Sequence, residues 1–260
     1  MPTFRSHGGL EMAYNCWGDP EGVPVLLHHG FAATARIDWV ETGVVDALTA
    51  AGRRVVAPDA RGHGRSDKPH SPSRLGEARM AEDVESLLRQ LGAAHVDLVG
   101  YSMGAIVALM TATRSRRVRR LVVGGVGAAV VELGGVDARV LSPEALCEAL
   151  LTDNPSSITN PNAAAFRSFT EATGADRVAL AAQTVARHRD RIPLEDVSVP
   201  TLVLAGLDDP LATRPEVLAA AILHSQLQLI PGDHGGVLRE PGFRDAIVAF
   251  LAEGREVGGA

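Results

Sequence analysis

The chain of 260 residues has a single lysine, two cysteines and few aromatic side chains. The lone Lys68 leaves little basis for a lysine Schiff base or for a phosphate-binding loop that ends in lysine. Cys16 and Cys147 are too few and too far apart in the sequence for a disulfide framework or a metal site. We therefore expect no metal ion in this protein.

Long apolar runs and basic blocks are also missing. The longest apolar stretch, residues 121–131, is too short and too rich in glycine to cross a bilayer, and the start at Met1–Arg5 has no apolar signal segment. The formal net charge is −6, and the arginines within residues 114–120 sit between a predicted helix and strand, where they stay solvated. We expect a cytoplasmic protein with a small-molecule substrate and no nucleic-acid or membrane partner; its oligomeric state is left open.

The composition otherwise fits a folded enzyme-sized domain. Apolar residues make up 46% of the chain and charged residues 22%, which is enough to bury a full core. After a hairpin predicted over residues 3–17, short apolar runs alternate with helical periodicity, so we predict a mostly parallel sheet with helices on both faces. The predicted strands cover residues 23–28, 53–57, 96–99, 121–123, 201–205 and 227–230, and the predicted helices cover 44–51, 77–91 and 243–251.

One region interrupts this alternation. Ser142-Pro143-Glu144 is typical of a helix start, and further helices are predicted over residues 162–173 and 176–190. The region is much longer than one crossover connection needs. We predict a helical lid, residues 124–193, inserted in a core domain of residues 1–123 and 194–260 and placed over the carboxyl ends of the strands.

Ser102 carries the strongest chemical signal. It lies between an apolar run and a helical segment, with a glycine two residues away on each side. Because glycine has no Cβ, a strand and a helix can pack closely around a strained turn with serine at its apex. Such a turn exposes the hydroxyl group and directs the next backbone N–H toward a developing oxyanion. The turn consists of Gly100-Tyr101-Ser102-Met103-Gly104.

A serine nucleophile needs a base, and the base needs a group that orients it. The strand predicted at residues 201–205 is followed by Asp208 and Asp209, and the last strand is followed by His234 in a glycine-flanked loop. Both loops fall on the edge of the sheet that carries Ser102. The order serine, acid, histidine is that of serine hydrolases built on such a sheet, although these observations leave the two aspartates hard to separate.

The neighbouring loops supply further candidates. The segment His28-His29-Gly30-Phe31 follows the first central strand, where the N–H of Phe31 can join that of Met103 as an oxyanion donor. Phe166 and Phe169 are three residues apart and share a helix face, although such pairs more often pack into a core. The candidate apolar walls of a substrate pocket are Trp39, Tyr101, Phe166 and Phe169.

Several polar residues receive other interpretations. His63 lies in a glycine-rich turn and is expected to bond to the backbone, and His188 lies at the charged end of a lid helix and is expected on the surface. Asp233 is interpreted as a turn residue, while Glu132 and Asp137 are weak substitutes for the acid. The predicted lid offers few charged anchors for a substrate.

These motifs together resemble the α/β-hydrolase fold, and within it the lidded esterases, lactonases and carbon–carbon hydrolases. The resemblance covers nearly the whole chain. In that family the acid usually lies three residues after a glycine, here Gly206, which selects Asp209, whereas glycine rather than Asp233 usually precedes the histidine. The matching segments are His29-Gly30-Phe31, Asp59–Ser66, Gly100–Gly104, Gly206–Asp209, and His234 with Glu240-Pro241.

The resemblance implies a cofactor-free serine hydrolase that cleaves a small carboxylic ester, lactone or thioester through Ser102, His234 and Asp209. Carbon–carbon bond hydrolysis, cofactor-free haloperoxidase activity and a binding role without turnover remain open on this fold. Epoxide hydrolases and haloalkane dehalogenases of the fold are disfavoured, because they use aspartate where Ser102 stands. The glycine pattern of residues 121–127 lacks the long helix of a dinucleotide site, so no nicotinamide cofactor is expected.

Overall fold

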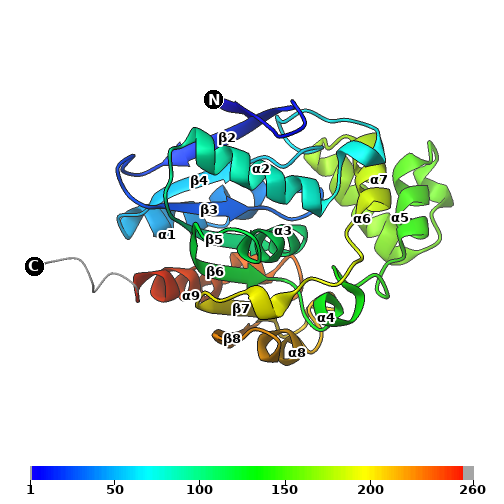
Figure 1. The fold of residues 1–260 in the computed structure, drawn as a ribbon. Helices are drawn as coiled ribbons and strands as arrows, with labels where there is room; N and C mark the ends of the chain where they lie inside the picture. Colours follow the sequence, from blue (N-terminus) through cyan, green and yellow to red (C-terminus); the bar gives the residue numbers. More distant parts are fainter. Residues whose placement is uncertain (1, 254–260) are drawn as a thin grey trace, which may run out of the picture.

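An eight-stranded sheet runs through the centre of the protein in the computed structural model, which describes residues 2–253 (Figure 1). Its strand order is β1-β2-β4-β3-β5-β6-β7-β8. Strands β1 and β2 form the predicted hairpin, β2 pairs antiparallel with β4, and every later pairing is parallel. The strands are β1 (Thr3–Arg5), β2 (Glu11–Trp17), β3 (Pro24–His28), β4 (Arg54–Pro58), β5 (Val96–Tyr101), β6 (Val118–Gly124), β7 (Thr201–Gly206) and β8 (Ser225–Ile230).

Helices cover both faces of this sheet, because its central strands are apolar on both sides. Strands β3, β5 and β7 are buried along their whole length, as parallel strands between two helix layers must be. Helices α2 (Glu77–Gln90), α3 (Met103–Ala112) and α8 (Pro215–Ala220) pack into one core, while α1 (Val44–Ala50) and α9 (Pro241–Ala252) pack into the other. The predicted α/β architecture is therefore confirmed.

Three helices lie apart from the sheet, beyond the carboxyl ends of its strands (Figure 1). They are α5 (Pro143–Leu151), α6 (Pro161–Thr173) and α7 (Arg177–Ala186). Ser142, Asn160 and Asp176 cap their N-termini by accepting backbone N–H bonds, which fixes where each helix begins. A small apolar cluster joins them to the loop after β3 through Ala32, Leu150, Leu180 and Ala181.

Some short elements were not predicted from the sequence. Helix α4 (Ala129–Leu133) follows β6 and packs beside α8 on the body of the protein (Figure 1). A π-helical turn, η1 (Arg36–Val40), follows β3, and α7 ends at Ala186 rather than at residue 190. Across residues 2–253, no helix is both long enough and apolar enough to cross a membrane. Single 3₁₀ turns are η2 (Pro72–Arg74), η3 (Pro155–Ser157), η4 (Leu194–Asp196) and η5 (Val237–Arg239).

Candidate active site

Ser102 occupies a strained turn between β5 and α3. Its backbone has φ 53° and ψ −116°, a conformation that costs free energy for a residue with a side chain. A Cβ added to Gly100 would lie 2.1 Å from the carbonyl oxygen of Gly104, and one added to Gly104 would lie 2.1 Å from that of His28. Both glycines are therefore required by the close packing that holds this serine.

His234 lies within hydrogen-bond distance of both Ser102 and Asp209. Its Nε2 atom is 3.0 Å from Ser102 Oγ, and its Nδ1 atom is 2.8 Å from Asp209 Oδ2. The carboxylate can only accept, so Nδ1 carries the proton and Nε2 is free to accept the proton of the serine hydroxyl. Asp209 is itself fixed, because its other oxygen accepts the N–H of Leu211 at 2.8 Å and its side chain is fully buried.

The other acids lie elsewhere. Asp208 is exposed, and Asp233 accepts the N–H groups of Gly235 and Gly236 as a turn residue. The side chains of Glu132 and Asp137 are held by Arg139 instead of by a histidine. The structure thus brings Asp209, and not its neighbour, into contact with His234.

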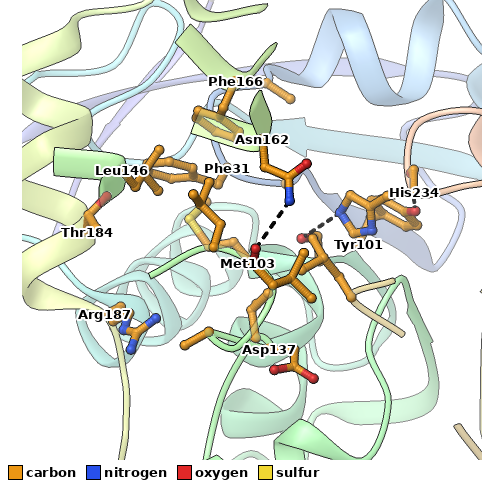
Figure 2. Close-up of a pocket in the computed structure, with 18 of the residues that line it drawn as sticks. Phe31, Tyr101, Met103, Asp137, Leu146, Asn162, Phe166, Thr184, Arg187 and His234 are labelled. Carbon is orange, nitrogen blue, oxygen red and sulfur yellow. Dashed lines mark hydrogen bonds between the residues drawn. The ribbon is translucent and has the colours of Figure 1, made fainter. Parts of the chain in front are cut away.

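Tyr101 positions the histidine loop. Its hydroxyl donates to the carbonyl oxygen of His234, and the two ring centroids are 5.1 Å apart (Figure 2). Burial raises the pKa of Tyr101 well above its usual value, with the charges of Asp209 and Asp38 adding to the effect. The phenol therefore stays protonated as a donor. A Cβ on Gly125 would lie 2.6 Å from the Tyr101 ring, so this glycine leaves room for it.

The loop after β3 is built to present backbone N–H groups. Among residues 2–253 the backbone N–H groups of Phe31 and Met103 have no hydrogen-bond partner. Gly30 donates to Asp38 Oδ2 at 2.8 Å, and His29 Nδ1 lies 2.7 Å from the carbonyl oxygen of Gly30. The loop is thus held on its inner side, while the N–H of Phe31 stays unpaired.

Asp38 is a carboxyl group that the sequence analysis missed. It lies on η1, is 5% exposed and lines the cavity beside Ser102 and His234. Burial raises its pKa to about 6, and the N–H of Gly30 and the nearby His234 partly oppose that rise. An aspartate between Ile37 and Trp39 was the available signal.

Three buried histidines support the loops and stay neutral. Burial lowers the pKa of His28 and of His63 to about 4 and that of His29 further below its usual value. His29 Nε2 accepts the N–H of Ala60 at 2.9 Å, and His63 Nδ1 lies 2.9 Å from the carbonyl oxygen of Arg61. The first contact joins the loop after β3 to the loop after β4, and the second lies within the loop after β4. Within residues 2–253 no group of histidine, cysteine and acidic side chains has an arrangement suited to a metal ion.

A cavity of about 590 Å³ opens over Ser102, and helices α5–α7 form much of its wall. Its lining is mostly apolar; Phe166 stacks on Phe31 with ring centroids 5.3 Å apart (Figure 2). Tyr101, Phe166 and Phe169 line the cavity, and Phe169 remains 41% exposed.

Trp39 does not line the cavity, contrary to the prediction. It is completely buried in the core shared by α1 and α9. On the single turn η1, neighbouring side chains point in different directions, so Asp38 faces the cavity and the large apolar Trp39 packs beneath the sheet. Burying the large apolar indole in this core lowers the free energy of the folded state more than leaving it exposed in a cavity wall would.

His188 is also placed differently from the expectation. It is half-buried and lines the cavity together with Glu77, Gln183 and Arg187. Burial lowers its pKa. The sequence analysis did not predict this polar part of the cavity wall. A charged segment at the end of a helix has the same sequence pattern whether it faces solvent or a cavity.

Comparisons with known proteins agree with this architecture. Residues 23–130 match the family described as alpha/beta hydrolase fold. The sn-1-specific diacylglycerol lipase ABHD11 of Mus musculus is 30% identical over 271 aligned residues, covering 94% of this chain and 86% of that protein. The 3-oxoadipate enol-lactonase 2 of Acinetobacter baylyi is 29% identical and covers 76% of this chain and 78% of its own.

Solved structures extend the likeness over nearly the full length. A hydrolase from Pseudomonas aeruginosa superimposes with a TM-score of 0.79 at 27% identity, covering 96% of this chain and 97% of that one. A thermophilic esterase from Thermogutta terrifontis gives a TM-score of 0.74 at 28% identity, with 97% and 98% covered. From the identity to the mouse protein and the extent of its coverage, the chain belongs to the α/β-hydrolase family.

Proposed function

We propose that the protein is a cofactor-free serine hydrolase that cleaves a small carboxylic ester, lactone or thioester. The observation that carries the proposal is the series Ser102, His234, Asp209, with contacts of 3.0 and 2.8 Å. An unperturbed serine hydroxyl is a weak nucleophile, and a base held at this distance is what activates it.

In the proposed reaction His234 Nε2 takes the proton of Ser102 while Oγ attacks the carbonyl carbon. Asp209 holds the imidazole in the required tautomer and stabilises its charged form. The N–H groups of Phe31 and Met103 receive the oxyanion, and each such donor contributes roughly 3–4 kcal/mol to lowering the barrier. His234 then protonates the leaving group, an acyl-enzyme remains, and water activated by His234 releases the acid.

The proposed lid comprises residues 124–193 between the two parts of a core domain, residues 1–123 and 194–260. Helices α5, α6 and α7 supply its walls, and the cavity they cover holds Ser102. A covered cavity excludes water, which strengthens the electrostatic effect of the oxyanion donors. The size of the cavity fits a small-molecule substrate.

A serine-directed label tests the nucleophile. Ser102→Ala should abolish labelling by a fluorophosphonate and reduce ester turnover by up to roughly a millionfold, because the attacking atom is gone. Ser73→Ala is the matched control, since Ser73 is exposed and does not line the cavity. Both variants should keep the parental circular-dichroism spectrum.

Two outcomes would redirect the proposal. Labelling that persists in Ser102→Ala would place the nucleophile at another serine. Turnover of a vinylogous diketone in preference to aryl esters would identify carbon–carbon bond hydrolysis with the same residues.

A further inference from the structure

The wall of the cavity that lies across from His234 is polar. Figure 2 shows Thr184 and Arg187 on one side of the cavity and His234 on the other, with Phe31, Leu146 and Met103 between them. Gln183 and Thr184 come from the last turns of α7, and Arg187 and His188 follow it directly. The proposed reaction uses none of these side chains.

Three nitrogen atoms in this wall are buried without a hydrogen-bond partner in residues 2–253. They are Gln183 Nε2, Arg187 Nε and His188 Nε2. Burial raises the pKa of Glu77, and the Gln183 side chain lies close enough to that carboxyl to oppose the rise, while the His188 side chain interacts with the backbone of Asp190. Arg187 Nε is therefore the clearest unpaired donor of this wall. Buried polar groups are nearly always paired, so an unpaired guanidinium nitrogen needs an explanation. A ligand with acceptor atoms provides one, because all three side chains belong to the cavity lining.

The Gln183 amide is held in place rather than mobile. Gln183 is 2% exposed, and its Oε1 atom accepts the N–H of Gly76 at 2.7 Å. That bond fixes which end of the amide is the donor, since an N–H can only donate to the oxygen. The backbone N–H of His188 donates to Glu77 Oε2 at 2.7 Å, which fixes the chain beside Arg187.

Arg187 supplies a positive charge that forms no direct ion pair, although the charges of Glu77 and Glu144 act on it from a greater distance. Its guanidinium makes no hydrogen bond and has no carboxylate oxygen within 4 Å among the described residues. Asp137 is bound to Arg139, and the Glu77 carboxyl accepts the backbone N–H of His188, while Arg187 and Gln183 also oppose the rise of its pKa that burial causes. A planar guanidinium that is half-buried and unpaired matches the two oxygens of a carboxylate.

The position of this wall also indicates which part of the substrate reaches it. His234 must give its proton to the leaving group, so the leaving group lies on the side of His234. In the pose that we infer, the acyl chain extends in the other direction, past Phe31 and Met103 toward Arg187. The apolar stretch between them suits methylene groups.

We propose that Gln183, Arg187 and His188 bind a carboxylate at the far end of the acyl chain. The substrate class is then an ester, lactone or thioester of an acid that carries a second carboxylate. This inference deepens the proposed function and rests on it for the ester chemistry, but the carboxylate site can be tested separately.

The kinetic test compares matched esters. Monoaryl esters of α,ω-dicarboxylic acids with four to eight carbons are compared with the same esters whose free carboxylate is methylated. The parental protein should prefer the free carboxylate by at least about tenfold in kcat/KM at one chain length. Arg187→Gln should remove this preference, because the esters with a free carboxylate lose more kcat/KM than the methylated esters do. Arg189→Gln, an exposed neighbouring arginine, should retain the preference.

A binding test distinguishes the carboxylate site from the proposed ester hydrolysis. Free dicarboxylates should bind Ser102→Ala by calorimetry, and the added change Arg187→Gln should abolish that binding. Equal turnover of free and methylated esters at every length, without dicarboxylate binding, would overturn the carboxylate site and leave the hydrolase proposal intact. Binding that depends on Arg187 with no ester turnover by the parental protein would support the site and overturn the ester chemistry.

Discussion

At the scale of single residues, the candidate site depends on buried carboxyl groups that differ in their partners. Asp209 is buried with an imidazole and a backbone N–H, whereas Asp38 is buried with the N–H of Gly30 as its hydrogen-bond donor. Similar burial therefore has different consequences. Asp209 is placed to orient a base, while the cost of ionising Asp38 raises its pKa.

The two adjacent aspartates provide a sharp comparison. Asp209→Asn should reduce kcat on the order of ten-thousandfold, because an amide favours the wrong tautomer of His234. Asp208→Asn is its matched control, since Asp208 is exposed on the same loop. Steady-state kinetics on an aryl ester measures both, and a larger loss for Asp208→Asn would show that the acid has been assigned to the wrong residue.

Asp38 should make stability depend on pH. The folded-state pKa of about 6 lies above the usual 3.8, so between about pH 4 and pH 6 the folded state binds more protons than the unfolded state. Stability must then fall as pH rises through this window. An asparagine at this position cannot ionise, so the Asp38→Asn variant does not lose this stability. The unfolding free energy of the variant minus that of the parental protein should therefore rise by up to about 3 kcal/mol from pH 4 to pH 7.

Urea unfolding at pH 4, 5, 6 and 7 measures this difference. Asp46→Asn on α1 is exposed and should show no such trend. Parallel stability curves for Asp38→Asn and the parental protein would mean that the Asp38 carboxyl titrates normally.

At the scale of elements, the helices beyond the sheet determine the shape of the cavity. Helix α6 places Phe166 against Phe31 of the loop after β3, and thereby links the helices to the loop that presents an oxyanion donor. Arg167, buried on the same helix, donates to the carbonyl oxygens of Ala149 and Thr152 at the end of α5. These contacts hold α5 and α6 as one unit over the strand ends.

Shortening the α6 aromatic side chains should therefore alter substrate preference more than nucleophile reactivity. Phe166→Ala is expected to shift the kcat/KM profile toward longer acyl chains, because it opens space against Phe31. Phe169→Ala should have a smaller effect, since Phe169 is 41% exposed. Both should label with a very small phosphonate at near the parental rate.

Val178→Ala is a suitable control, because this α7 residue is 44% exposed and does not line the cavity. An unchanged chain-length profile in Phe166→Ala would remove Phe166 from the pocket wall and weaken the assignment of a lid.

At the scale of the whole molecule, a buried ion-pair network and the candidate catalytic residues lie at opposite ends of the sheet strands. Asp97, near the start of β5, is fully buried and paired with Arg53 and Arg119. Ser102, Asp209 and the loop to His234 all follow the carboxyl ends of strands. Parallel order brings these ends to one edge, so residues separated by up to 132 positions meet within 3.0 Å.

The sequence alone predicted the fold class, most of the strand and helix succession, and the residues of the candidate triad. Apolar runs, helical periodicity and glycines that permit close packing act through local rules that hold wherever the segment lies. The resemblance to the α/β-hydrolase family, through its usual spacing from Gly206, selected Asp209, which is the aspartate in contact with His234.

Tertiary structure alone decided which face of each local segment meets the cavity. Trp39 and Asp38 are adjacent, yet the first entered the core and the second the cavity wall. His188 was expected on a surface but lines the polar end of the same cavity together with Arg187. The reason is physical: a side chain's surroundings depend on the segments that fold against it, here α7 against the loop before α2, and the local sequence contains no record of those segments.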